Sequence, residues 1–335
     1  MINHGEAETM VAINFLVYLI VRSFSLTAYL LPFQLNALIG RLLGSTYYYM
    51  DRLRRRVIRA NISVVYGRRL DHRASEYLGR QSCQNLAMGI LDFLKLNAIA
   101  NSENYHKYIE IKGFSNITKS VERGKGTIVV SAHFGNIFLL KYACYLNIPA
   151  PGVIIRKIDN PHLERYVSSI LRAHDAILIR PTGALKRMRQ LLLQNGIAVT
   201  LADHKAGGNP RRGGRHGVVA DFFGIPSQTH ITAPLLARRT GATIVPVFVI
   251  RRGPGKYTIE VNKPLKRVHI ADEAAEIRQN TRKLNQVFEE YIERYPEHWF
   301  WLHRRWKDIE GLEDLYVTNR PLETIENFRR NRGGD

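Results

Sequence analysis

Cysteine is nearly absent from this sequence of 335 residues, which has only two, Cys83 and Cys144. Two distant thiols provide neither a disulfide framework nor a paired metal-binding motif. His298 and His303 are five residues apart and do not match the His-Glu-x-x-His pattern of a zinc site. We therefore expect no metal, and a reducing compartment is the simplest setting for the chain.

Acidic residues are scarce relative to basic ones. The chain has 29 Asp and Glu against 49 Lys and Arg, which gives a formal net charge of +20. Such a balance implies an anionic partner, namely nucleic acid, a phospholipid surface or a phosphorylated substrate. A content of 45% hydrophobic and 10% aromatic residues excludes a disordered polycation. Because no helix-turn-helix, RNA-recognition or zinc-finger motif is present, we expect anionic membrane lipid and no nucleic acid.

No A-x-A-like cleavage site accompanies the one long hydrophobic run, residues 10–31. Its length is close to the roughly 20 residues needed to cross a bilayer. Arg22 near its middle weakens a spanning arrangement by about 3 kcal/mol. We expect a retained membrane anchor, either spanning or lying flat, with a soluble core helix as the alternative. An arginine cluster follows and, by the positive-inside rule, places the next domain in the cytoplasm. Its members are Arg52, Arg54, Arg55, Arg56 and Arg59.

The sequence also lacks internal repeats and low-complexity linkers. Residues 51–67 and 73–98 have the apolar spacing of helices. From about residue 105, β-rich runs alternate with helical windows at 137–146, 163–173, 184–194 and 231–239, and a long helix is expected over 271–295. The β-rich runs are 107–113, 126–132, 150–156, 176–181, 196–203, 242–252 and 256–261, and the last two could form a hairpin. This alternation predicts an α/β fold with a largely parallel central sheet flanked by helices. We predict an anchor (1–45), a helical region (46–104), an α/β domain (105–310) and a C-terminal tail (311–335).

The stretch "TIVVSAHFGN" suggests a catalytic base. His133 follows a predicted buried strand, and ligands of open α/β sheets bind beyond the carboxyl ends of strands. There, a histidine could remove the proton from a hydroxyl so that its oxygen attacks an activated acyl carbon. A capping or core histidine is the alternative.

Several motifs in this order resemble the late acyltransferases of lipid A biosynthesis, within the wider group of bacterial lysophospholipid and glycolipid acyltransferases. They are "SAHFGN", "RKIDNP", "FFGIPSQT", "ARRTGATIVPV" and "PEHWFWLHRRWK", and the resemblance extends to about Lys307. It implies an α/β domain anchored at the cytoplasmic face of the inner membrane. It also implies acyl transfer to a lipid hydroxyl from acyl-carrier protein or coenzyme A, with no bound cofactor.

The chain departs from that family at one position. The family motif His-x-x-x-x-Asp/Glu reads here from His133 to Phe138, and phenylalanine cannot accept the second imidazole N–H. Asp203, at the end of another predicted strand, is the favoured replacement, and Asn136 or water could also orient the ring. Asp221 is a weaker candidate. The remaining alternative is a catalytically inactive, lipid-binding homologue.

Other site residues are expected around this histidine. The oxyanion would be held by backbone N–H groups at Gly135 and Asn136 or by Arg156. The resemblance makes the stretch 156–172 an acceptor-side site, and the glycine-rich stretch 203–224 is typical of a mobile cationic loop that binds phosphate. Solvated basic surface is the alternative for both. The substrate-binding candidates are Lys157, Asn160, Arg165, Arg172, Lys205 and Arg212. The tryptophans of the last motif suit either membrane headgroups or the core.

Overall fold

The computed structural model describes residues 4–101, 103–140, 148–172, 176–207 and 217–332. Four helices come first: α1 (His4–Leu30), α2 (Phe33–Met50), α3 (Arg52–Tyr66) and α4 (His72–Ile99). The predicted helices at 51–67 and 73–98 are thus confirmed. Helix α2 was not separated from the anchor in our prediction, although Pro32 favours a helix boundary just before it.

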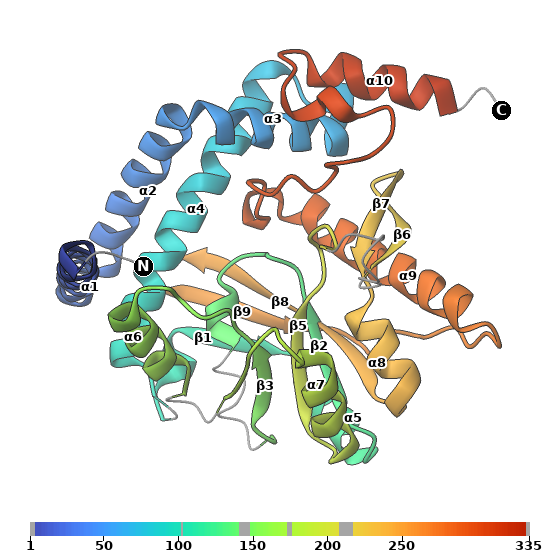
Figure 1. The fold of residues 1–335 in the computed structure, drawn as a ribbon, viewed down its shortest axis with the longest axis horizontal. Coiled ribbons are helices and arrows are strands. Elements are labelled where there is room, and N and C mark those ends of the chain that lie inside the picture. Colours follow the sequence, from blue (N-terminus) through green and yellow to red (C-terminus); the bar gives the residue numbers. More distant parts are fainter. Residues whose placement is uncertain (1–3, 102, 141–147, 173–175, 208–216, 333–335) are drawn as a thin grey trace.

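The centre of the molecule is the expected β-sheet of mostly parallel strands, as in an α/β fold (Figure 1). Its seven strands lie in the order β1-β9-β8-β2-β5-β3-β4, and only the β8–β9 pair is antiparallel. All seven predicted β-rich runs contain one of these strands. Their bounds are β1 (Ile109–Lys112), β2 (Thr127–Ser131), β3 (Pro151–Ile154), β4 (Ile177–Ile179), β5 (Ile197–Leu201), β8 (Thr243–Gly253) and β9 (Lys256–Val261).

Helices cover both faces of this sheet. Strand residues alternate between two apolar cores: Ile128 and Val130 of β2 belong to one, and Val129 belongs to the other. The later helices are α5 (Ser115–Glu122), α6 (Pro161–Arg172), α7 (Ala184–Leu193), α8 (Thr232–Thr240), α9 (Glu273–Arg294) and α10 (Pro321–Arg332). Short 3₁₀ turns occur at Gly67–Arg69, Tyr105–Lys107, Pro296–His298 and Glu313–Tyr316. Of the predicted helix at 137–146, residues 137–140 form a 3₁₀ turn and 141–147 lie outside the described residues.

Part of the glycine-rich stretch at 203–224 differs from our expectation of a mobile loop, and residues 208–216 of it lie outside the described residues. Its end forms strand β6 (Gly217–Phe222), which pairs with β7 (Ile225–His230) in a separate antiparallel hairpin. Glycine and arginine around it concealed the β-forming run "GVVADF". Arg305 ties this hairpin to the C-terminal segment, because its buried guanidinium donates to the Gln228 carbonyl and the Thr229 hydroxyl.

The three tryptophans of the C-terminal motif are core residues. Trp299, Trp301 and Trp306 are each almost completely buried and pack on one another and on Phe222. A headgroup-contacting role for them is therefore wrong. The tail beyond residue 310 folds back so that α10 lies against α3 (Figure 1). Ile325 and Phe328 of α10 join the same core.

Candidate active site

The structure brings His133 and Asp203 together at one edge of the sheet. Strands β2 and β5 are parallel neighbours with Ser131 opposite Leu201, so the two strands end at the same level of the sheet. His133 Nδ1 lies 2.8 Å from Asp203 Oδ1, and the His133 backbone N–H donates to the same oxygen at 2.9 Å. The contact expected from parallel-strand topology is confirmed.

Asp203 is completely buried and its other oxygen is also occupied, since the Trp299 indole N–H donates to Oδ2 at 2.8 Å. Burial by itself would raise the pKa of Asp203. The adjacent imidazoles of His133 and His204 and the hydrogen bonds outweigh it and hold the pKa below its usual range. An ionised Asp203 accepts the Nδ1–H of His133, which leaves Nε2 as the basic nitrogen.

Two further histidines, which the sequence did not single out, continue a stack of rings that begins at His133. The His204 ring lies parallel to that of His133 at a centroid distance of 3.5 Å, and His303 stacks on His204 at 3.8 Å. Burial lowers the pKa of His204 to about 3 and that of His303 to about 4. Both are neutral at pH 7 and add no competing positive charge. The one local signal was the position of His204 immediately after Asp203.

Among the described residues, His133, Asp203 and His204 form the group whose ligand atoms are close enough for a metal ion, all within 4.8 Å of one another. The two imidazole planes are only 5° from parallel. Their in-plane nitrogen lone pairs therefore run side by side. Tetrahedral coordination would require them to converge on one point, and they do not. These three residues therefore fit a hydrogen-bonded His133–Asp203 pair with His204 stacked on it better than a metal centre.

Other residues near His133 are engaged elsewhere. The Asn136 amide donates to the Gly89 carbonyl of α4 at 2.7 Å. The backbone N–H of Gly135 donates to the His298 carbonyl at 2.7 Å, so the expected oxyanion role of this N–H is wrong for this geometry. Gly135 has φ +59°, and a Cβ there would lie 1.8 Å from the Val249 carbonyl oxygen, which explains the glycine.

Phe138 is a wall residue. Its ring packs on Phe93 of α4 at a centroid distance of 4.9 Å, and the residue remains 43% exposed. Asp221, the weaker candidate partner, lies on hairpin strand β6 opposite Pro226. Asp203 therefore takes the role of hydrogen-bond acceptor for His133 that Phe138 cannot fill.

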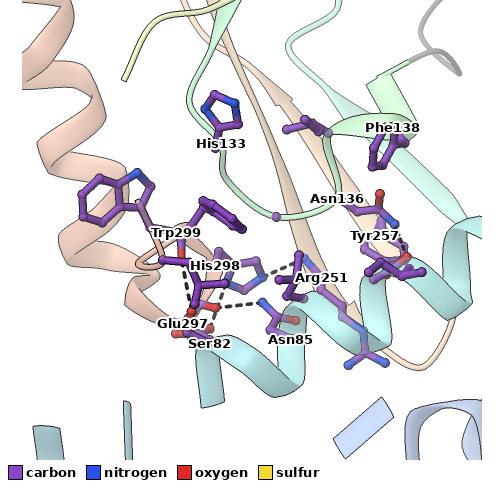
Figure 2. A pocket seen from close by; sticks show the side chains of 17 residues that line it. Ser82, Asn85, His133, Asn136, Phe138, Arg251, Tyr257, Glu297, His298 and Trp299 are labelled. Atoms are coloured by element: carbon purple, nitrogen blue, oxygen red, sulfur yellow. Dashed lines mark hydrogen bonds and ion pairs between the residues drawn. The ribbon is translucent and has the colours of Figure 1, made fainter. Parts of the chain in front are cut away.

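His133 is the junction of two cavities. One has a volume of about 660 Å³ and lies against β3, β4 and β5. The other has a volume of about 190 Å³ and lies between α4 and the loop that carries His133 (Figure 2). His133, Ile137 and Phe138 line both. The larger one is walled mainly by aliphatic side chains, including Val153, Ile154, Leu178, Val199 and Leu201.

The expected substrate-side residues have different outcomes in the structure. Arg156, Lys157 and Arg165 are all exposed, and Arg156 also lines the larger cavity. Asn160 is buried and caps α6, because its side-chain oxygen accepts from the backbone N–H groups of His162 and Leu163. Arg172 is the last residue of α6; its side chain, like all of Arg212, lies outside the described residues.

Lys205 belongs to a third, cationic cavity of about 380 Å³, next to His303. Lys205 forms an ion pair with Asp308. The other basic residues that line this cavity are Arg54, Arg304 and Lys307.

Comparison with known proteins gives a consistent picture. Residues 3–308 match the family model described as bacterial lipid A biosynthesis acyltransferase. A lipid A biosynthesis lauroyltransferase of Escherichia coli K12 is 29% identical over 215 residues, which are 63% of this chain and 66% of that protein. A lipid A biosynthesis palmitoleoyltransferase of the same strain is 22% identical over 297 residues, covering 86% and 90% of the two chains. A lipid A biosynthesis acyltransferase of Haemophilus influenzae is 23% identical over 283 residues, covering 83% and 86%. Because the family model spans nearly the whole chain, the protein belongs to the bacterial lipid A biosynthesis acyltransferase family.

Proposed function

We propose that this protein moves a fatty acyl chain from an acyl thioester to a hydroxyl, or a hydroxyl on an acyl chain, of a phosphorylated glycolipid, namely a lipid A precursor. The observation that carries the proposal is the His133–Asp203 pair at the mouth of a large aliphatic cavity. The names of the relatives support the reaction and the acceptor class. The thioester is carried by acyl-carrier protein or coenzyme A.

In the proposed mechanism, His133 Nε2 accepts the proton of the acceptor hydroxyl while its oxygen attacks the thioester carbonyl. Asp203 stabilises the imidazolium that forms, through the 2.8 Å contact with Nδ1. Collapse of the tetrahedral intermediate breaks the carbon–sulfur bond, and the imidazolium returns the proton to the thiolate. The products are an ester and a free thiol, and His133 is again neutral.

The oxyanion of this intermediate requires a positive partner. Arg156 lines the larger cavity together with His133, so a guanidinium is present on the wall along which the acyl chain would lie. Arginine suits this role because it is always charged and offers several N–H donors. We assign Arg156 to the oxyanion or to an acceptor phosphate, and the aliphatic cavity to the donor acyl chain.

Phosphate groups of the substrate would find cations in the third cavity. Arg54, Lys205, Arg304 and Lys307 line it beside His303, which stacks on His204 and so lies two rings from the base. Arginine and lysine in one concave site favour phosphate. We propose that this cavity receives a phosphate of the acceptor or of the donor carrier.

The second candidate function is lipid binding without catalysis, which Phe138 favours because the usual acidic residue of the motif is missing. The geometry of Asp203 supports the active alternative: it supplies the carboxylate from a neighbouring strand, in hydrogen-bond contact with His133. An inactive parent protein, with every acyl carrier and chain length, would favour the binding function.

We further propose a location at the inner membrane with the catalytic domain on the cytoplasmic side. Helix α1 is long and apolar enough to cross a membrane, by length and composition. The arginines at the start of α3 follow it and supply the positive charge expected on the cytoplasmic side.

The test is the lipid composition of cells that contain the parent protein, a His133→Ala variant or neither. Mass spectrometry of the extracted lipid should show one acyl chain fewer both in cells without the protein and in cells with the variant. A His269→Ala variant, which changes a solvent-exposed imidazole, should restore the acyl chain. Identical lipid in cells with and without the parent protein would contradict the proposal.

A further inference from the structure

One face of α1 is attached to α6 along much of its length. The Asn160 side chain donates to the Asn14 carbonyl at 2.7 Å, and Ser25 Oγ lies 2.8 Å from the Tyr166 hydroxyl. Between these points the Arg22 guanidinium lies over the Tyr166 ring at 4.8 Å. The Tyr18 ring also contacts that of Tyr166, and residues 14, 18, 22 and 25 recur at helical spacing and therefore share one side of α1.

The end of α1 is attached to α4. Lys95 Nζ donates to the Leu31 carbonyl at 2.6 Å and also to that of Tyr29. The end of α1 also contacts α2, since the Asn36 side chain of α2 donates to the Ala28 carbonyl at 2.7 Å. From Asn14 to Leu31 a helix advances about 25 Å, so the protein contact extends along most of a hydrocarbon core of about 30 Å.

The opposite side of α1 is apolar and uncovered. Leu16, Ile20 and Leu30 are 58%, 60% and 69% exposed. A second exposed apolar stripe follows on α2, where Leu35, Leu38 and Leu42 recur at three- and four-residue spacing. Exposed apolar surface on this scale marks an interaction site.

A membrane-spanning α1 would carry its attached neighbours into the hydrocarbon. Arg22 faces α6, Lys95 holds the end of α1, and Glu164 and Arg165 lie on the first turns of α6 itself. Ionised side chains at the bilayer centre are costly and are usually enclosed by protein. A helix lying in the membrane plane instead keeps these charges on the protein side and its exposed leucines in the acyl chains.

We propose that α1 lies flat in one leaflet of an anionic phospholipid membrane, with its contact face on α4 and α6 and its opposite face in the lipid. Arg41 of α2 and Arg52, Arg54 and Arg55 of α3 provide cations for the headgroups. The N-terminus and the catalytic domain then lie on the same side of the membrane. This inference concerns membrane geometry and holds whether or not the proposed acyl transfer is correct.

Depth measurements on the full chain test the proposal. A fluorophore is attached to Leu16→Cys or Leu30→Cys, in a background with Cys83→Ala and Cys144→Ser, in vesicles of phosphatidylethanolamine and phosphatidylglycerol containing brominated lipid. Quenching should place both probes at the same shallow depth. In a spanning helix the two probes would be about 20 Å apart along the bilayer normal, on opposite sides of its centre, and unequal distances from the bilayer centre would overturn the proposal. Absence of quenching at both positions would overturn it too, because the exposed face would then contact no lipid.

Labelling in cells gives a second, independent result. Glu6→Cys lies near the N-terminus and Glu310→Cys on the exposed surface of the catalytic domain. A membrane-impermeant maleimide added to spheroplasts should label neither variant until the membrane is lysed, and then both. Labelling of the Glu6→Cys variant alone in intact spheroplasts would show a spanning helix. Activity of the parent protein is assayed separately, so an inactive enzyme would not be mistaken for a wrong topology.

Discussion

At Asp203, both carboxylate oxygens accept hydrogen bonds from fixed donors in the buried site. One oxygen receives the backbone N–H and the ring N–H of His133, and the other receives the Trp299 indole. This arrangement fixes the orientation and tautomer of the imidazole more firmly than a single contact would. Asp203 reaches His133 across neighbouring strands, whereas the motif His-x-x-x-x-Asp/Glu places its acid five residues after the histidine.

Asp203→Asn should lower the acyl-transfer rate by about 100- to 10,000-fold. An amide has only one accepting oxygen and cannot stabilise the imidazolium by charge, so His133 loses its partner while the shape is kept. Asp221→Asn is the matched control, since Asp221 lies on the β6 hairpin. Rates from steady-state assays, with thermal melting to verify folding, check the prediction. Equal rates for the parent and Asp203→Asn would show that the contact has no catalytic role.

His204 gives a prediction about pH and stability. Its pKa is lowered from 6.5 to about 3 by burial, so the unfolded chain binds a proton below about pH 6.5 that the folded chain does not. The free energy of unfolding should therefore fall, for this group by up to about 1.4 kcal/mol per pH unit, as pH drops below that value. His303 acts in the same direction, and the depressed pKa of Asp203 contributes only below about pH 4.

Urea unfolding of a His204→Phe variant in detergent, between pH 6.5 and 4.5, measures this effect. The aromatic ring keeps the stack but cannot be protonated, so its stability should depend less steeply on pH than that of the parent. Equal slopes for the two proteins would contradict the assignment of a buried, neutral His204.

The position of His133 after a β-rich run, together with the resemblance to the lipid A acyltransferases, made it recognisable before the fold was known. Asp203 was favoured as its partner because it ends another β-rich run of the predicted parallel sheet. The choice among Asp203, Asn136 and Asp221 stayed open, since it depends on which strands are neighbours. The stack of His204 and His303 was not predictable. The two rings come from segments about a hundred residues apart, and only the buried packing of the C-terminal segment brings them together.

At the scale of elements, the close contact of α2 and α4 depends on two glycines spaced four apart. A Cβ at Gly44 would lie 2.4 Å from Gln84 Cα and 2.5 Å from the Cys83 carbonyl oxygen, and one at Gly40 would lie 2.8 Å from Met88 Cα. These clashes involve helix backbone, which cannot move aside as a flexible side chain can. The glycines thus set the distance at which α2 packs.

Gly44→Ala should lower the free energy of unfolding by about 1–3 kcal/mol, because overpacking outweighs the gain in helix propensity. Gly89→Ala on α4 is the control, since its added Cβ would meet Asn136 only at 3.7 Å or more. Urea unfolding in detergent gives both values. A Gly44→Ala variant at least as stable as the Gly89→Ala variant would rule out tight α2–α4 packing.

The strands of the central sheet were all anticipated from β-rich runs, whereas hairpin β6–β7 and helices α5 and α10 were not. The hairpin follows a glycine- and arginine-rich stretch. In a sequence-based prediction, the composition of that stretch outweighs the short alternating pattern of the hairpin strands. Helix α5 has only eight residues, and helices this short depend on packing more than on propensity.

At the scale of the whole molecule, the composition indicated an anionic partner. The fold contains separate surfaces for the apolar and the charged parts of such a partner. The basic residues behind the net charge of +20 are scattered along the sequence, and they include the arginines of α3 and the cations beside His303. The tryptophans, whose location composition alone could not predict, belong to the core next to the His133–Asp203 pair. Together, the apolar α1, the aliphatic cavity and the cationic cavity match the chemistry of a phosphorylated lipid.

The central claim is that His133 is the base of an acyl transfer, and a purified assay tests it most directly. The full chain in detergent is incubated with a lipid A precursor and acyl-carrier-protein or coenzyme A thioesters, and products are identified by mass spectrometry. The parent protein should add the mass of one acyl chain, and folded His133→Ala protein should do so about 100- to 10,000-fold more slowly. Undiminished transfer by the His133→Ala variant would contradict the account.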